Sequence, residues 1–204
     1  MSEARASVHG MTRIIFDTAV SLNGWIADEG NSLDWLLSLE APIDAEVALF
    51  PDADVLVEGS TTYEWVLDHE DLLARPERWR ALYGDRPIYV FTTRELPVPR
   101  GADVRLRSGS VLDVLDEIRV AAGEGDVWVV GGGDLAGQFL DAGVLDEIAV
   151  SIAPVLLTGG APLLPRRRSA DGLRLRSAQS VGPFARLVYE VIREATGGAC
   201  RTSP

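Results

Sequence analysis

The chain has 204 residues, 47% of them hydrophobic and 25% charged, and a formal net charge of −12, which is typical of one globular domain whose acidic surface repels nucleic acid. No apolar run reaches the roughly 18–20 residues of a membrane span, and the N-terminus lacks the apolar segment of a signal peptide. The single cysteine, Cys200, excludes an internal disulfide and a thiolate metal site, so we expect a cytoplasmic protein with no metal and no membrane contact.

A regular hydrophobic pattern begins only near Met11, which is a second possible start besides Met1. No internal repeat and no low-complexity linker divides the sequence after that point. We therefore expect a single domain over residues 12–193, with disordered tails at 1–11 and 196–204.

The first half of this domain alternates predicted strands and helices. Segments rich in β-branched and aromatic residues predict strands at 13–20, 53–59 and 86–95. The turn signals Asn23-Gly24 and Gly30-Asn31 precede a short helix that begins at Asp34. Further helices are predicted at 42–50 and 60–68.

The second half predicts strands at 102–108, 126–130 and 145–157, and helices at 110–125 and 134–143. Two final strands, at 173–181 and 185–194, form a predicted hairpin through Gly182-Pro183. Strands thus alternate with helices up to residue 143, and only strands follow. This order predicts an α/β fold with a mixed, mostly parallel sheet, helices on both faces and antiparallel strands at the C-terminal edge.

Three predicted strands end in residues that suit a phosphate group: Gly59-Ser60-Thr61-Thr62, Thr92-Thr93-Arg94 and Gly131-Gly132-Gly133. Ligands of open α/β sheets bind at the C-terminal ends of the strands, where helix N-termini supply free amides and glycines admit a phosphate to the backbone. Each segment also has a plainer interpretation, as a turn or as a helix N-cap by Ser60 or Thr61. The three together favour an anion-binding site.

Residues 131–136 match the G-x-G-x-x-A fingerprint of Rossmann dinucleotide-binding domains, but their context argues against that fold. The fingerprint belongs to the first strand–helix unit, whereas here it lies about two-thirds along the chain. The strand that follows also lacks the acidic residue expected about 20 residues further on.

An ordered set of motifs resembles a known family: "SLNGWIA" (21–27), "DWL" (34–36), "GSTTYE" (59–64), "VFTTR" (90–94), the long segment 129–160 and "LVYEV" (187–191). The sequence is similar to the dihydrofolate-reductase-like superfamily, in the branch of the reductase domain of the bifunctional riboflavin-biosynthesis deaminase-reductase. The resemblance covers about residues 12–193. It implies the mixed, largely parallel sheet described above and NADPH as the cofactor.

The resemblance also implies roles for individual residues. Those expected at the cofactor phosphates, pyrophosphate and nicotinamide are Gly59, Ser60, Thr61, Thr62, Gly131, Gly132, Gly133, Asp134 and Leu135. Thr93 and Arg94, with Thr92 beside them, are expected to hold the adenosine 2′-phosphate, since a guanidinium forks onto phosphate oxygens. Trp35 is expected against the nicotinamide, although it could equally be a core aromatic residue.

The chain departs from the family pattern at several positions. Asn23 stands where the family usually has an aspartate, so Ser21 and Asn23 are the candidate substrate-binding residues and offer no carboxylate. Ser60 replaces an arginine, and Val130 replaces a glutamate of the riboflavin-pathway reductases. Because the segment 65–73 also lacks their arginine, we do not expect a ribityl phosphate substrate.

These features favour an NADPH-dependent reductase that transfers a hydride to a small heterocyclic substrate, pterin- or pyrimidine-like, or to a carbonyl substrate. Asp34 is the candidate catalytic residue, as a proton-relay or substrate-anchoring carboxylate, although an aspartate there could be a plain N-cap and water could supply the proton. Since acid–base residues are few, a nucleotide-binding sensor or carrier without turnover is the alternative. A flavin-binding, flavodoxin-like domain is a weaker one.

We also expect a symmetric homodimer. The segment 145–160 is long, apolar and rich in β-formers, and near a sheet edge it would expose unpaired backbone groups. The closing hairpin could cover part of it, and we expect a second chain to cover the rest. Two-fold dimers are the commonest oligomers, and relatives that resemble this chain commonly pair. The expected interface includes residues 148–158 and 184–193.

Overall fold

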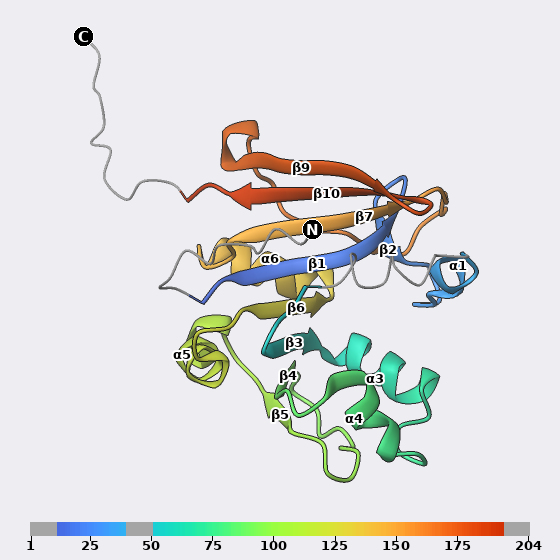
Figure 1. Cartoon of the computed structure of the whole chain (residues 1–204), viewed down its shortest axis with the longest axis vertical. Helices are drawn as coiled ribbons and strands as arrows, with labels where there is room; N and C mark the ends of the chain where they lie inside the picture. Colours follow the sequence, from blue (N-terminus) through green and yellow to red (C-terminus); the bar gives the residue numbers. More distant parts are fainter. Residues whose placement is uncertain (1–11, 40–50, 194–204) are drawn as a thin grey trace, which may run out of the picture.

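Eight strands form the central sheet of the described part of the chain, in the order β5-β4-β3-β6-β1-β7-β10-β9 (Figure 1). The computed structural model describes residues 12–39 and 51–193, so the predicted helix at 42–50 and the predicted tails lie outside the described residues. The strands of this sheet are β1 (Ile14–Ser21), β3 (Val55–Gly59), β4 (Ile88–Phe91), β5 (Val104–Arg107), β6 (Val127–Gly131), β7 (Glu147–Ala153), β9 (Leu173–Val181) and β10 (Phe184–Val191). Two short strands, β2 (Trp25–Ala27) and β8 (Ala161–Pro162), pair separately.

The strands from β5 to β7 in this order run parallel, and β10 and β9 add an antiparallel pair at one end. The predicted fold class is therefore confirmed. The predicted hairpin is also present, with Gly182 at a φ of 54° in its turn. A flavodoxin-like domain has a doubly wound parallel sheet without this closing pair, so that alternative is wrong.

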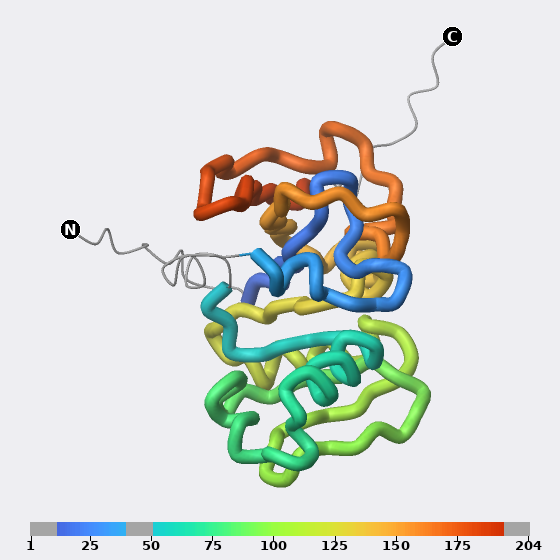
Figure 2. The backbone as a smooth tube through the Cα atoms, turned by 90° about the vertical axis from the view of Figure 1, so that its right-hand side faces the viewer, coloured from blue at the N-terminus to red at the C-terminus, as the bar shows by residue number. Residues whose placement is uncertain are grey.

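Helices cover both faces of the sheet. The buried side chains of α5 and α6 belong to one hydrophobic core, and those of α3 and α4 to a second core on the opposite face. Figure 2 shows the C-terminal strands at one end of the molecule, in orange and red, and α3, α4 and β5 at the other. The helices are α1 (Asp34–Leu37), α3 (Ser60–His69), α4 (Glu77–Tyr83), α5 (Val111–Ala122), α6 (Gly133–Asp141) and the 3-10 turn η1 (Ala170–Gly172).

Helix α5 shows how the local sequence specifies an element. Ser110 accepts a hydrogen bond from the Leu112 N–H at 3.2 Å, and the Asp113 carboxylate accepts one from the Ser110 N–H at 3.2 Å, which together form a capping box. Gly123, with φ of 58°, ends the helix. The helical spacing predicted for this segment is confirmed by its buried face, formed by Val111, Val114, Leu115, Ile118 and Ala122.

Two expectations about single elements are wrong, and one helix was not predicted. The strand predicted at 145–157 ends at Ala153, because Pro154 has no N–H to give to a ladder that has a strand on each side. Since β7 lies between β1 and β10, this segment is not near a sheet edge; the edge strand there is β9. Helix α4 was not expected, although Pro76 and Gly84 bracket it.

No helix within residues 12–39 and 51–193 is both long enough and apolar enough to cross a membrane.

Candidate functional site

The C-terminal ends of β4, β3 and β6 lie side by side. These strands are parallel neighbours in the sheet, with Gly59 in register with Phe91 and Glu58 in register with Gly131. The segments that begin at Gly59, Thr92 and Gly131 therefore meet at one edge of the sheet, as the sequence predicts.

This edge is also the point where the connections of the sheet change direction. From β3 the chain passes through α3 and α4 to β4, whereas from β6 it passes through α6, on the opposite face, to β7. Open α/β sheets bind their ligands at such switch points, outside the C-terminal ends of the strands. The boundary between β3 and β6 is thus the expected ligand position in this fold.

Both helices that begin at this boundary start without a side-chain cap. The N-cap residue of α3 is Gly59 and that of α6 is Gly132, and neither helix start receives a side-chain hydrogen bond. The expectation that Ser60 or Thr61 caps α3 is wrong, because β3 runs directly into the helix and both residues fall in its first turn. Two uncapped N-termini offer backbone amides and the positive ends of two helix dipoles to an anion.

The three consecutive glycines each have a different environment. A Cβ on Gly131 would lie 3.0 Å from the Thr62 Oγ1, which shows that β6 ends against the first turn of α3. A Cβ on Gly133 would lie 2.2 Å from the carbonyl oxygen of Leu163, so α6 begins in close contact with that backbone. A Cβ on Gly132, whose peptide bond with Gly131 is cis, would meet nothing within 4 Å. The middle glycine therefore borders open space, as the approach of a phosphate requires.

The sheet opens beside these glycines. Strand β1 pairs with β6 only from Ile14 to Phe16, whereas its pairing with β7 continues to Ser21. The ladder between β1 and β6 stops at Val129, two residues before Gly131. The backbone pairing of β1 with β6 thus ends before the glycines are reached.

Arg94 follows β4, so it lies on the side of β3 that faces away from β6. The Thr92 Oγ1 accepts a hydrogen bond from the Arg94 N–H at 3.0 Å, which folds the chain back after β4. The Arg94 guanidinium then forms a bidentate pair with Glu64 on α3, with Nη1 3.0 Å from Oε1. Thr93 is exposed beside it. The arginine predicted to bind a phosphate is thus in the expected region, but a carboxylate holds it.

Trp35 and Asp34 belong to α1, which Figure 1 shows beyond the C-terminal end of β1. The Trp35 Nε1 is buried and has no hydrogen-bond partner among residues 12–39 and 51–193. Asp34 is exposed in the first turn, and the N-cap residue of α1 is Leu33, so the plain N-cap interpretation of Asp34 is wrong. Both side chains remain available for a ligand.

Ser21 and Asn23 are engaged in the structure of the β1–β2 turn. The Ser21 Oγ accepts a hydrogen bond from the Trp25 N–H at 2.9 Å and donates to the Asn23 Oδ1 at 3.0 Å. The Asn23 amide also accepts from the Leu157 N–H and donates to the Leu157 carbonyl oxygen. An aspartate could not donate that last bond, so the Asn23 amide has a structural role in holding this turn against Leu157.

Asp134 and Leu135 contribute to the site through their backbone at most. Asp134 pairs with Arg166 at 3.0 Å, and its pKa lies below the ordinary value because Gln138 and Arg166 donate hydrogen bonds to it. Leu135 is buried in the core. The Arg166 side chain packs against Gly137 and also pairs with Asp141, so these contacts hold it in place.

Glu58 is a residue of this region that the sequence interpretation missed. It lies on β3 next to Gly59 and is 1% exposed, and neither of its carboxylate oxygens has a hydrogen-bond partner in the described part of the chain. Burial raises its pKa from 4.5 to about 8. Burial also raises the pKa of Tyr63 and Tyr83, and the nearby Glu58 adds to that effect. A charged residue inside the apolar run "VLVEG" is the signal that could have drawn attention to it.

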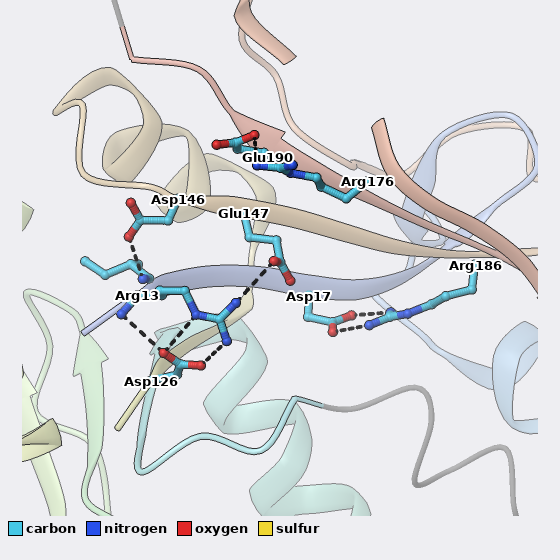
Figure 3. A network of polar contacts seen from close by, with 9 residues as sticks. Arg13, Asp17, Asp126, Asp146, Glu147, Arg176, Arg186 and Glu190 are labelled. Atoms are coloured by element: carbon cyan, nitrogen blue, oxygen red, sulfur yellow. Dashed lines mark hydrogen bonds and ion pairs between the residues drawn. The ribbon is translucent and has the colours of Figure 1, made fainter. Parts of the chain in front are cut away.

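A cavity of about 520 Å³ lies near the N-terminal ends of β1 and β7, at the end of these strands away from the glycines. Figure 3 shows several of the charged residues that line it, among them Arg13, Asp146 and Glu147. Its charged residues neutralise one another: Arg13 pairs with Glu147, Arg193 with Asp146, and Arg176 with Glu190. Because every one of these charges has a partner, the uncapped helix N-termini are the better candidate site.

Comparison with known proteins agrees with this fold. The family described as the RibD C-terminal domain matches residues 12–185. The chain is 27% identical over 178 residues to YwjB of Bacillus subtilis strain 168, an uncharacterized protein, covering 84% of this chain and 93% of YwjB. It is also similar to the crystal structure of a putative riboflavin biosynthesis protein from Shewanella sp. PV-4, with a TM-score of 0.70, 28% identity, and coverage of 90% and 100%.

The fold extends to dihydrofolate reductase. The Enterococcus faecalis enzyme, complexed with NADP(H) and RAB-propyl, has a TM-score of 0.56 at 16% identity, covering 88% of this chain and 96% of that one. The molecule thus has a dihydrofolate-reductase-like, reductase-type fold. Within that class, the chain belongs to the family of the RibD C-terminal domain.

Proposed function

We propose that this chain is an NADPH-dependent reductase of a small heterocyclic or carbonyl substrate. The observation that carries the proposal is the meeting of two uncapped helix N-termini, at Gly59 and Gly132, beside the separation of β1 from β6. That arrangement fits a dinucleotide, which needs donors for its phosphates and a slot for its ring. The NADP(H) bound by the E. faecalis enzyme supports the same choice of cofactor.

In this proposal, different residues contact three parts of the cofactor: the pyrophosphate, the nicotinamide and the adenosine. Backbone amides at Ser60–Thr62 and Gly132–Gly133 would hold the pyrophosphate. The nicotinamide would enter beside β1, since the strands separate only there, and the adenosine would extend toward β4. Thr93 and Arg94 would then meet the 2′-phosphate.

Bound NADPH would supply the hydride for the reduction. The orphaned Nε1 of Trp35 would donate to the cofactor or substrate, because a buried indole N–H without a partner is otherwise costly. Asp34 is the proposed source of the proton, either directly or through water, since it is exposed and adjacent to Trp35. The substrate is proposed to be small and without a ribityl phosphate, because Val130 and residues 65–73 lack the groups that would hold one.

Nucleotide binding without turnover is the second candidate. Ser21 and Asn23, the predicted substrate-side residues, use their polar atoms within the β1–β2 turn, and this leaves few groups for acid–base chemistry. Such a protein would bind NADPH and reduce nothing.

The deciding experiment combines a binding measurement with a turnover measurement. Purified protein is titrated with NADPH by fluorescence, and NADPH oxidation is then followed against pterins, pyrimidines, quinones and simple carbonyl compounds. Binding with oxidation of at least one class supports the reductase. Binding with no oxidation by any class favours the carrier, and absence of binding refutes both.

We also propose that the chain acts as a homodimer, now with a different structural reason. Strand β7 is interior, but β9 is an open edge strand, and its Leu175 is 51% exposed. The interface would include β9 together with exposed parts of the predicted segments 148–158 and 184–193, such as Leu156, which is 69% exposed. Light scattering should give about twice the 22.0 kDa of one chain, and a monomer mass that persists at rising concentration contradicts this proposal.

A further inference from the structure

The bidentate pair between Arg94 and Glu64 connects the end of β4 to α3 beside the proposed phosphate site. Arg94 Nη1 lies 3.0 Å from Glu64 Oε1, and Nη2 bonds the other oxygen. Glu64 lies in the second turn of α3, one turn beyond the uncapped amides at its start. The carboxylate therefore occupies the two-pronged face of the guanidinium that a phosphate would use.

The pair is accessible to an incoming nucleotide. The Arg94 side chain is 54% exposed and that of Glu64 is 38% exposed, so neither is locked into the core. An exposed ion pair is weak and can open, which leaves Arg94 able to reach a phosphate at the expense of its contact with Glu64. A carboxylate at this position also repels a phosphate directly, whereas it can accept a hydrogen bond from a free ribose 2′-hydroxyl.

We propose that Glu64 sets the cofactor specificity of this chain by competing with the 2′-phosphate for Arg94, so that the protein accepts NADH as well as NADPH. This inference rests on the proposed function. Glu64 is a specificity-determining residue in it: its carboxylate weakens NADPH binding and supports NADH binding, while Arg94 does the reverse. Removing the carboxylate converts the site into an NADPH-selective one.

The test is the ratio of the dissociation constants for NADH and NADPH in Glu64→Gln. We expect NADPH to bind about three- to fivefold more tightly than to the wild type, with NADH unchanged or weaker, as the loss of an exposed pair would give. Asp85→Asn is the matched control. This variant also breaks an exposed pair, with Arg80 at 2.8 Å, and removes one negative charge. Asp85, however, precedes the N-terminal end of β4, whereas Arg94 follows its C-terminal end.

A second background separates competition for Arg94 from a plain charge effect. In Arg94→Ala, the further change Glu64→Gln should give much less gain in NADPH binding, because no guanidinium is left to release. An equal gain in that background, an equal gain in Asp85→Asn, or an unchanged ratio in Glu64→Gln overturns the inference while leaving the proposed function intact. If neither nucleotide binds any variant that melts like the wild type, the proposed function fails and the inference fails with it.

Discussion

Arg186 on β10 reaches across β7 to form a buried, bidentate pair with Asp17 on β1 (Figure 3). Its Nη1 lies 2.6 Å from Asp17 Oδ1 and 3.0 Å from the Ser151 hydroxyl oxygen, and the two charged side chains are only 8% and 2% exposed. Three strands of the sheet thus share one charged cluster. A buried pair of this kind is costly to break from one side, since the remaining charge has no partner.

Asp17→Asn should therefore lower the free energy of unfolding by about 3–5 kcal/mol, because Arg186 would keep its charge in a buried site. The double variant Asp17→Val with Arg186→Met should recover most of that loss, since it removes both charges and keeps the volume apolar. Urea unfolding curves measure both. A single variant that loses less than roughly 1 kcal/mol would show that water already reaches the pair.

Glu58 should make the stability of the protein fall as pH rises. In the folded state its pKa is raised to about 8 by burial, whereas in the unfolded chain it ionises near 4.5. Between these values unfolding releases a proton from Glu58, so the contribution of Glu58 to the free energy of unfolding decreases as pH rises from about 4.5 to about 8 and is constant on both sides of that window. The loss over that window is on the order of 4–5 kcal/mol.

Glu58→Met removes this dependence and should stabilise the protein most at pH 8, since it replaces an unpartnered carboxyl with an apolar side chain of similar length. Glu58→Gln is the control, because its amide is polar but cannot ionise. Tyr63 and Tyr83 stay neutral over the window, since burial raises the pKa of both. Thermal unfolding at several pH values would contradict the assignment if the wild type and Glu58→Gln keep parallel curves from pH 5 to pH 8.

Arg94→Ala should weaken NADPH binding by at least about tenfold, since the variant loses the charged, forked donor for the 2′-phosphate. NADH has no such phosphate, so its affinity should change little. Titration of both nucleotides by fluorescence measures the difference. An unchanged NADPH affinity would mean that the adenosine does not extend toward β4.

The sequence was sufficient for the fold and for the position of the candidate site, because both depend on local signals. Alternating patterns and glycines mark the strand ends, and parallel pairing brings Gly59 and Gly131 to one edge. It was insufficient for contacts between distant segments. Nothing near Asn23 indicates that its amide binds Leu157, 134 residues away, and nothing near Arg94 indicates that Glu64 holds it. Glu58 did carry a local signal, which the apolar run around it obscured.

The glycine series provides a test that separates folding from binding. A Cβ on Gly133 would lie 2.2 Å from the Leu163 carbonyl oxygen and 2.4 Å from that of Pro162, both of which are backbone atoms that cannot rotate away. Gly133→Ala must therefore displace α6 or the 162–163 segment, and we expect it to cost about 1–3 kcal/mol or more, as other overpacked sites do.

Gly132→Ala should behave differently. The φ of Gly132 is −84°, which any residue adopts, and its Cβ would meet no protein atom within 4 Å. The variant should unfold within a few degrees of the wild type, yet bind NADPH about tenfold more weakly, because the methyl group fills the space proposed for the pyrophosphate. Thermal unfolding and NADPH titration on the same preparations measure both properties. If Gly132→Ala folds normally and binds NADPH as the wild type does, the pyrophosphate does not lie against this glycine.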